Sequence, residues 1–193
     1  MSSAASGSGT PVVNSNPACC SIPPVLSDYT PKGAYRPYAG FKRVYITGPK
    51  TSDKAILSVF DIFGYVCIRL VSSELSNPPR RFFPQTQQGA DILANTMNAT
   101  VYMPDFFEPD KPFPIDKFPP ESDEEKDDLQ KFFAGPANPE KAVERAVSVG
   151  KALRENGAKF VGAYGMCWGG KVTILAGCED DPVFDAVAAI HPA

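Results

Sequence analysis

A short glycine-rich stretch near the end of the chain restricts the fold more than any other feature of the sequence. Residues 165–170 read Gly-Met-Cys-Trp-Gly-Gly, with an apolar run before them and a helix-like run after them. This pattern predicts a sharp strand-to-helix turn, because bulky residues do not fit at its two flanks. The turn would present Cys167 at a helix N-terminus, where backbone N–H groups and the helix dipole stabilise a thiolate. The alternative is a buried, inert cysteine, but the flanking glycines and the strand–helix context favour the turn.

The rest of the chain alternates between strand-like and helix-like segments. Apolar runs predict strands over residues 41–46, 55–60, 99–103, 160–164 and 186–190. Helices are predicted over residues 86–97, 122–133, 138–157 and 171–176. Strands separated by helices are typical of an α/β fold with a doubly wound, mostly parallel sheet.

Local signals also predict helix ends and buried helix faces. Ser122 and Glu125 form a capping box at the start of one helix. Asn138 caps the next helix, and Gly157 closes it. We expect an apolar group on or near one face of the first helix, namely Ala90, Ile92, Leu93 and Met97. In the third helix we expect a buried stripe of Ala142, Ala146, Val149 and Leu153.

Composition and charge exclude several classes of partner. The 193 residues are enough for one domain with a substantial core. A net charge of −3 argues against nucleic-acid binding, and no apolar stretch is long enough to span a bilayer. The acidic run at 121–128 is expected to be a solvated first turn of a helix rather than a cation site. The oligomeric state is left open.

The N-terminus and the cysteines indicate the compartment. Residues 1–18 carry no charged side chain and lack the features of a secretory signal or transit peptide, so we expect a disordered tail. The chain has five cysteines with no zinc spacing: Cys19, Cys20, Cys67, Cys167 and Cys178. We expect them to be reduced in a cytoplasmic protein, and the adjacent pair at 19–20 to be structural or incidental.

Several motifs occur in a characteristic order along the chain. They are Cys-Cys-Ser-Ile-Pro-Pro-Val at 19–25, Asp-Ile-Phe-Gly at 61–64, Met-Pro-Asp-Phe at 103–106, the glycine-rich stretch at 165–171, and Ile-His-Pro at 190–192. Together they resemble the dienelactone hydrolase family, and its fungal branch most closely. The resemblance covers roughly residues 17–193 apart from one segment, which suggests a single domain over 19–193 after the tail.

This resemblance implies an α/β-hydrolase fold and a Cys-His-Asp triad that cleaves esters or lactones without a cofactor or metal. Cys167 matches the nucleophile, and the backbone N–H groups of Ile62 and Trp168 match the donors of the oxyanion hole. Asp61 stands where other members carry a glutamate implicated in activating the thiol. The alternative role for Asp61 is to cap the loop at the end of its strand.

The triad acid and histidine of the family have no counterpart in the sequence. The sole histidine, His191, corresponds to a non-catalytic His-Pro pair of the family. The acidic residues between 179 and 185 precede the last predicted strand and should lie at its opposite edge from Cys167. We therefore expect a chain truncated at its C-terminus, which lacks the last strands of the fold and shows little turnover.

Residues 65–81 are a second departure from the family pattern. They separate the motif at 61–64 from the following helix and have no periodic pattern that completes the fold. We expect an insertion, either a substrate-covering lid or, as we favour, a translated intron.

The expected function is hydrolysis of a small ester or enol-lactone through thiolate attack by Cys167. Two other classes remain as alternatives. One is a non-catalytic relative that holds a small ligand above Cys167, and the other is a redox-sensing protein in which Cys167 oxidises reversibly.

Overall fold

The computed structural model describes residues 28–67 and 80–192. A six-stranded sheet in the order β1-β2-β6-β3-β7-β8 forms the centre of the molecule. The strands are β1 (Ala34–Tyr38), β2 (Phe41–Thr47), β3 (Lys54–Val59), β6 (Thr100–Pro104), β7 (Phe160–Met166) and β8 (Ala186–Ile190). β1 and β2 pair antiparallel, as do β2 and β6, whereas β6, β3, β7 and β8 run parallel. The predicted α/β fold with a mostly parallel sheet is thus confirmed.

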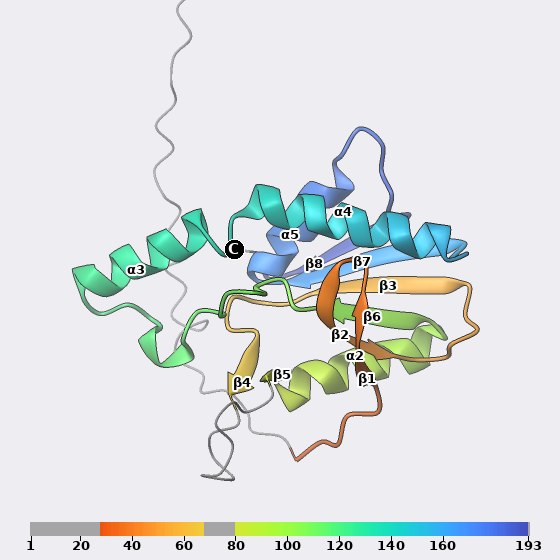
Figure 1. The fold of residues 1–193 in the computed structure, drawn as a ribbon, viewed down its shortest axis with the longest axis horizontal. Helices are drawn as coiled ribbons and strands as arrows, with labels where there is room; N and C mark the ends of the chain where they lie inside the picture. The colour runs from red at the N-terminus through yellow and green to blue at the C-terminus, as the bar shows by residue number, and fades with distance from the viewer. Residues whose placement is uncertain (1–27, 68–79, 193) are drawn as a thin grey trace, which may run out of the picture.

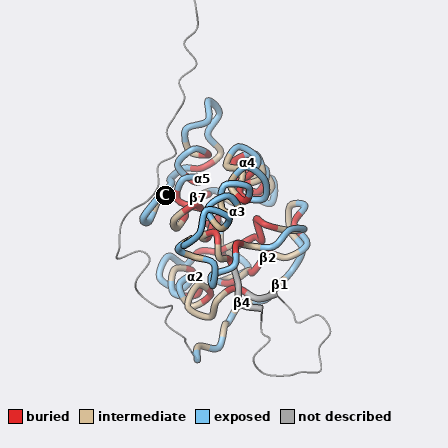
Figure 2. Tube along the Cα trace, turned by 90° about the vertical axis from the view of Figure 1, so that its left-hand side faces the viewer, coloured by how far each residue is buried: buried red, intermediate tan, exposed pale blue. Residues whose placement is uncertain are grey.

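Helices cover both faces of this sheet. α2 (Pro84–Met97) lies on one face, and α4 (Pro139–Glu155) and α5 (Trp168–Gly177) lie together on the other (Figure 1). α3 (Asp123–Ala134) and the short 3-10 helix η1 (Ile115–Lys117) extend beyond the end of the sheet where β3, β6 and β7 finish (Figure 1). The buried residues concentrate between the two helical layers (Figure 2).

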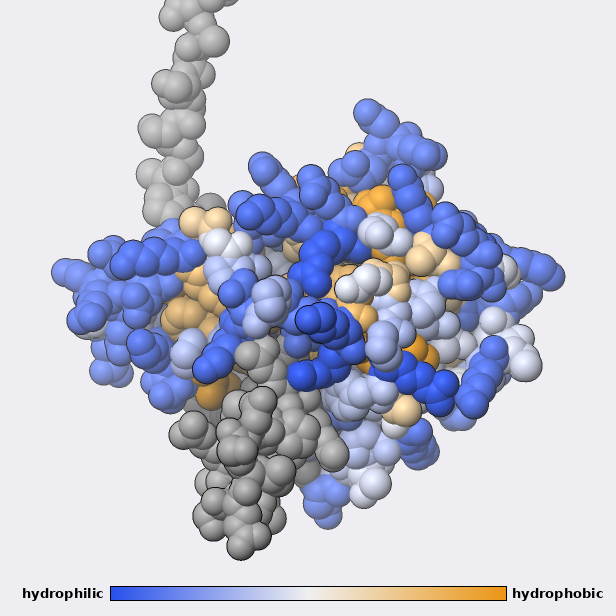
Figure 3. Space-filling model, viewed as in Figure 1, coloured by the Kyte–Doolittle hydropathy of each residue, from blue (hydrophilic) through white to orange (hydrophobic). Residues whose placement is uncertain are grey.

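The predicted helix caps are present. The Ser122 hydroxyl accepts a hydrogen bond from the Glu125 amide, and the Glu125 carboxylate accepts one from the Ser122 amide, which completes the capping box. The Asn138 side chain accepts from the amide of Lys141, three residues into α4. In the first turn of α3, Asp123 and Glu124 are exposed and Glu125 is half-buried. The outer side of this helix is hydrophilic (Figure 3).

The buried stripe predicted in α4 is correct, whereas the apolar residues grouped in α2 are only partly buried. Ala142, Ala146, Val149 and Leu153 of α4 are all buried, as predicted. In α2, however, Ile92 and Met97 are 58% and 45% exposed, and the buried residues include Gln87 and Asp91. The cause is a polar network in which Asp91 accepts hydrogen bonds from Tyr29 and Tyr45, so this helix turns a polar residue inward.

The two ends of the predicted insertion pair with each other. β4 (Tyr65–Cys67) and β5 (Arg80–Phe82) form a separate antiparallel two-stranded sheet, in which Tyr65 is opposite Phe82. Residues 68–79, like the predicted tail at 1–18 and the pair at 19–20, lie outside the described residues. The nature of the insertion therefore stays a prediction.

Candidate active site

Cys167 occupies a sharp turn between the end of β7 and the start of α5. Its backbone has φ 54° and ψ −121°, a conformation that non-glycine residues rarely adopt. Holding a residue in such a conformation costs about 1–3 kcal/mol and is typical of functional sites. The strand, turn and helix predicted from the sequence are present, although α5 begins at Trp168, earlier than predicted.

The two flanking glycines are required by close backbone contacts. A Cβ atom on Gly165 would clash with the carbonyl oxygen of Gly169. A Cβ atom on Gly169 would clash with the carbonyl oxygens of Val59 and Phe60, at the end of β3. The turn can therefore form only because both positions lack a side chain.

Backbone hydrogen bonds fix the turn on both sides of Cys167. The Cys167 amide donates to the Ile190 carbonyl at 3.0 Å, which ties the turn to the end of β8. The first helical bond of α5 runs from the Gly170 amide to the Cys167 carbonyl at 2.9 Å. The amides of Trp168 and Gly169 thus come before the first hydrogen bond within α5. The first N–H groups of a helix can donate hydrogen bonds to an anion.

The side chain of Trp168 anchors the start of α5 in the core. It is 1% exposed, and its Nε1 donates to the Ala137 carbonyl at 2.9 Å. Its ring lies 4.9 Å from that of Phe107 and 6.3 Å from that of Phe106. The sequence assigned a role only to the Trp168 backbone, so these anchors are a finding of the structure.

The loop after β3 lies beside the Cys167 turn. β3 and β7 are parallel neighbours in which Val59 is opposite Gly165, and Asp61 and Cys167 each follow this pair by two residues. Ile62 is buried, and its carbonyl accepts a hydrogen bond from the Phe113 amide at 2.8 Å. The structure thus places the predicted oxyanion loop and the predicted nucleophile on adjacent strand ends.

Asp61 acts as a cap of its own loop. Its Oδ1 accepts hydrogen bonds from the amides of Phe63 at 2.9 Å and Gly64 at 3.0 Å. Burial raises the pKa of the Asp61 carboxyl more than these two hydrogen bonds lower it. The loop-cap role expected as an alternative is therefore present, and a role in activating the thiol stays a prediction.

Asp105 directly follows β6 and is a buried acid to which the sequence assigned no role of its own. It is 1% exposed, and its Oδ1 accepts from the Phe107 amide at 3.1 Å. Arg43 is its ion-pair partner, with 3.8 Å between Nη1 and Oδ2. Burial raises the pKa of Asp105 to about 6, and the Phe107 hydrogen bond only partly opposes this. The motif at 103–106 marked this position, but its burial depends on distant residues.

No histidine–acid pair assembles beside Cys167 among the described residues. His191 is exposed at the end of β8, with φ 51°. Asp185 lies at the other end of β7, where it pairs with Arg154 at 2.7 Å and accepts from the Val161 amide at 2.7 Å. The described residues also hold no group of three or more His, Cys, Asp or Glu side chains that could bind a metal ion.

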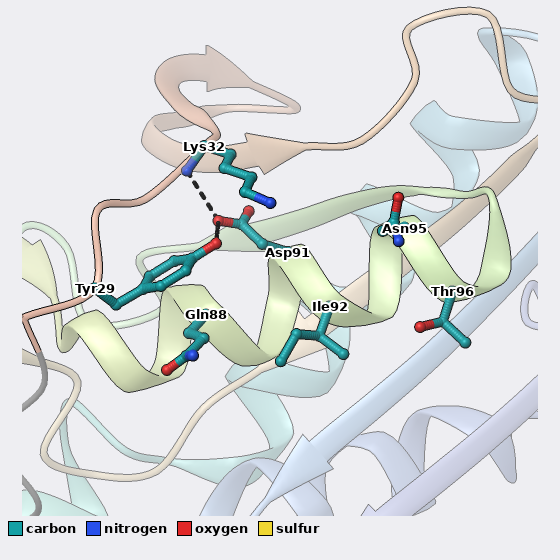
Figure 4. Close-up of a pocket in the computed structure, with 7 residues that line it drawn as sticks. All are labelled: Tyr29, Lys32, Gln88, Asp91, Ile92, Asn95 and Thr96. Carbon is teal, nitrogen blue, oxygen red and sulfur yellow. Dashed lines mark hydrogen bonds between the residues drawn. The ribbon is translucent and has the colours of Figure 1, made fainter.

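A surface pocket of about 210 Å³ lies on α2 and does not include Cys167 among its lining residues (Figure 4). It lies on the sheet face opposite to α4 and α5 (Figure 1). Its acid, Asp91, accepts hydrogen bonds from the Tyr29 hydroxyl at 2.8 Å and the Lys32 amide at 2.9 Å (Figure 4). The Asp91 carboxylate thus connects the segment before β1 to α2, and its oxygen atoms already accept hydrogen bonds from the protein.

None of the helices within residues 28–67 and 80–192 has the length and apolar character needed to cross a membrane.

Comparison with known proteins gives consistent matches over most of the chain. The sequence model of the dienelactone hydrolase family matches residues 82–193. An AIM2 family protein of Schizosaccharomyces pombe is 32% identical over 166 residues, which are 85% of this chain and 58% of the yeast protein. A second AIM2 family protein of this yeast is 28% identical over 178 residues, 87% of this chain and 64% of that protein. The chain thus spans less than two thirds of the length of either relative.

Among solved structures, a dienelactone hydrolase-like promiscuous phosphotriesterase from metagenomic libraries is similar, with a TM-score of 0.49 and 16% sequence identity. The match covers 84% of this chain and 59% of that one.

Proposed function

Because the chain belongs to the dienelactone hydrolase family, we propose that it is a hydrolase in which Cys167 attacks the carbonyl carbon of a small ester or enol-lactone. The observation that carries this proposal is the strained turn at Cys167 between β7 and α5. It presents the sulfur at the N-terminus of a helix, where the dipole and free amides favour the thiolate. A thiolate is the reactive form in acyl transfer.

The proposed first step forms a thioester on Cys167. The thiolate adds to the carbonyl carbon, and the carbonyl oxygen becomes an oxyanion that accepts hydrogen bonds from the amides of Ile62 and Trp168. Collapse of this intermediate breaks the ester C–O bond, and the departing alkoxide takes up a proton. Water then adds to the thioester, releasing the carboxylic acid and restoring the thiol.

Turnover by the 193-residue polypeptide should be slow. Its only histidine, His191, is exposed at the end of β8. Asp185, which precedes β8, lies at the opposite end of β7 and pairs there with Arg154. A nucleophile and oxyanion donors alone retain only part of the rate of a complete triad. We therefore propose that acylation of Cys167 is faster than release of the acyl group. We also propose a cytoplasmic location, where the thiol stays reduced.

The test is acylation by p-nitrophenyl acetate, followed by intact-mass and peptide analysis. We expect a burst of p-nitrophenol of one equivalent or less, an added acetyl group on Cys167, and slow turnover afterwards. Cys167→Ala should abolish the burst. Cys178→Ala is the matched control, because Cys178 is an exposed cysteine at the other end of the same helix and should leave the burst unchanged. A burst that survives in Cys167→Ala would disprove the role of this thiol.

A further inference from the structure

Arg145 of α4 clamps the loop that follows β6. Its Nη1 donates to the Phe106 carbonyl at 2.7 Å and to the Glu108 carbonyl at 3.5 Å. The guanidinium lies over the Phe41 ring, 4.0 Å from Cζ to the ring centroid, and near the Phe106 ring at 5.9 Å. A planar guanidinium can stack on a ring and donate to carbonyls at the same time, which the ammonium of lysine cannot do.

The clamped loop in turn supports Trp168. Phe106 and Phe107 are 3% and 1% exposed, and both rings contact the Trp168 ring. On its far edge Trp168 is fixed by the hydrogen bond to Ala137, just before α4. The Trp168 ring is therefore held between the loop after β6 and the segment before α4, and Arg145 secures the first of these two supports.

Trp168 is also the first residue of α5, so its amide moves with this anchored ring. An oxyanion donor has to lie 2.7–3.1 Å from the developing charge. A misplacement of about 1 Å can lower the rate about 10²-fold. The position of the Trp168 amide thus depends on how its buried side chain packs.

We infer that Arg145 is a positioning residue, which acts through Phe106, Phe107 and Trp168 to fix the Trp168 amide beside Cys167. The expected effect on acylation rests on the proposed function. The effect of Arg145 on the position of Trp168 rests only on the packing described above. No contact between Arg145 and the substrate is required.

Two measurements test this chain of contacts in the 193-residue polypeptide. Trp168 is the only tryptophan, so intrinsic tryptophan fluorescence reports on it alone. In Arg145→Met, we expect a red-shifted emission and stronger acrylamide quenching at temperatures well below unfolding. We also expect acylation of Cys167 by p-nitrophenyl acetate to slow by up to about 10²-fold. Alkylation by iodoacetamide should slow much less, because it forms no carbonyl oxyanion.

The Arg145→Lys variant distinguishes the effect of the positive charge from the effect of the planar guanidinium. It keeps the positive charge but loses the planar stack, so we expect intermediate emission and intermediate acylation. The matched control is Arg154→Met, on the same helix. Arg154 also clamps carbonyls, donating to Lys159 at 2.7 Å and Val183 at 3.2 Å, but it does so at the opposite end of β7 from Cys167. It should leave both the emission and the ratio of acylation to alkylation unchanged.

Several outcomes would overturn the inference. Unchanged Trp168 emission in a folded Arg145→Met variant would do so, as would equal slowing of acylation and alkylation. Wild-type behaviour of Arg145→Lys would show that charge alone matters, and this variant decides the question if Arg145→Met does not fold. Loss of acylation in the wild type, with the emission shift still present in Arg145→Met, would instead contradict the proposed function.

Discussion

The side chain of Asp105 combines deep burial with an ion-pair partner, and this makes its titration measurable. Burial raises its pKa to about 6, above the 3.8 of an ordinary aspartate. The folded state therefore binds this proton more tightly than the unfolded state. The resulting stabilisation is complete below pH about 4 and is lost as the pH rises through about 6. We predict that Asp105→Asn removes this loss, since asparagine does not titrate.

The measurement is the free energy of unfolding by urea at pH values from 4 to 7. From the size of the pKa shift, the wild type should lose up to about 3 kcal/mol over this range relative to Asp105→Asn. Asp128→Asn serves as the control, because Asp128 is 41% exposed and should follow the wild type. Parallel pH profiles for wild type and Asp105→Asn would contradict the prediction.

The contribution of Asp91 to stability should change with pH in the opposite direction to that of Asp105. Burial raises its pKa, but hydrogen bonds from Thr47, Lys32 and the two tyrosine hydroxyls outweigh this, and the net pKa is lowered. Its contribution to stability is thus present above the ordinary aspartate pKa and is lost as the pH falls through the folded value. Asp91 and Asp105 are both buried, and their contributions to stability therefore respond to pH in opposite directions.

At the candidate site, the sequence predicted those features that depend on residues close together in the chain. The turn at Cys167 needs glycine at positions 165 and 169, and a requirement of this kind is visible in a short motif. The contacts of Arg145 and the burial of Asp105 involve residues about 40 or more positions away, or side chains on other elements. Long-range packing of this kind leaves no local pattern to recognise.

Among the elements, the hydrophobic periodicity of the sequence predicted the strands and the helix face whose placement depends on burying apolar side chains. The apolar runs of β3, β6 and β7 and the buried stripe of α4 were found as expected. β1 was not predicted, because it is short and contains Pro37, which an edge strand tolerates. Its pairing with β2 shifts register between Arg36 and Tyr38, next to this proline. The buried face of α2 contains two polar residues beside Ala90 and Ala94, because the Asp91 carboxylate turns inward to accept hydrogen bonds from Tyr29 and Tyr45.

The paired ends of residues 65–81 make this segment separable from the main sheet. Tyr65 is opposite Phe82, so residues 64 and 82 are close in space, and the family match begins at residue 82. We predict that deletion of 65–81, which joins Gly64 to Phe82, leaves a folded protein. A shorter loop should change the free energy of unfolding by only about 1 kcal/mol. Thermal melting and Trp168 emission measure the outcome.

A deletion of similar length provides the control. Residues 105–120 also form a long connection, but Phe107 and Phe113 within it are buried and the Phe113 amide bonds to the Ile62 carbonyl. Removing this segment should unfold the protein. If the 65–81 deletion unfolds it as well, the segment is an integral part of the domain and the idea of an insertion is wrong.

For the molecule as a whole, β8 is the most exposed part of the sheet. It lies at the end of the strand order, and four of its five residues are exposed. Val187 and Ile190 are 40% and 55% exposed, and the outer edge offers backbone N–H and C=O groups to another strand. Within residues 28–67 and 80–192, no strand pairs with this outer edge, and an apolar edge of this kind favours pairing with a second molecule. We predict that the 193-residue polypeptide self-associates through β8.

Sedimentation velocity over a range of protein concentrations measures this association. Ile190→Lys should shift the distribution towards monomer, because a lysine on an edge strand opposes pairing. The matched control is Ile92→Lys on α2, which places the same charge at a side chain that is 58% exposed but lies away from β8. It should leave the association unchanged, since a general gain in solubility would affect both variants alike. A monodisperse wild-type monomer at all concentrations would show that this edge does not pair, and equal effects of the two lysines would assign the association to another surface.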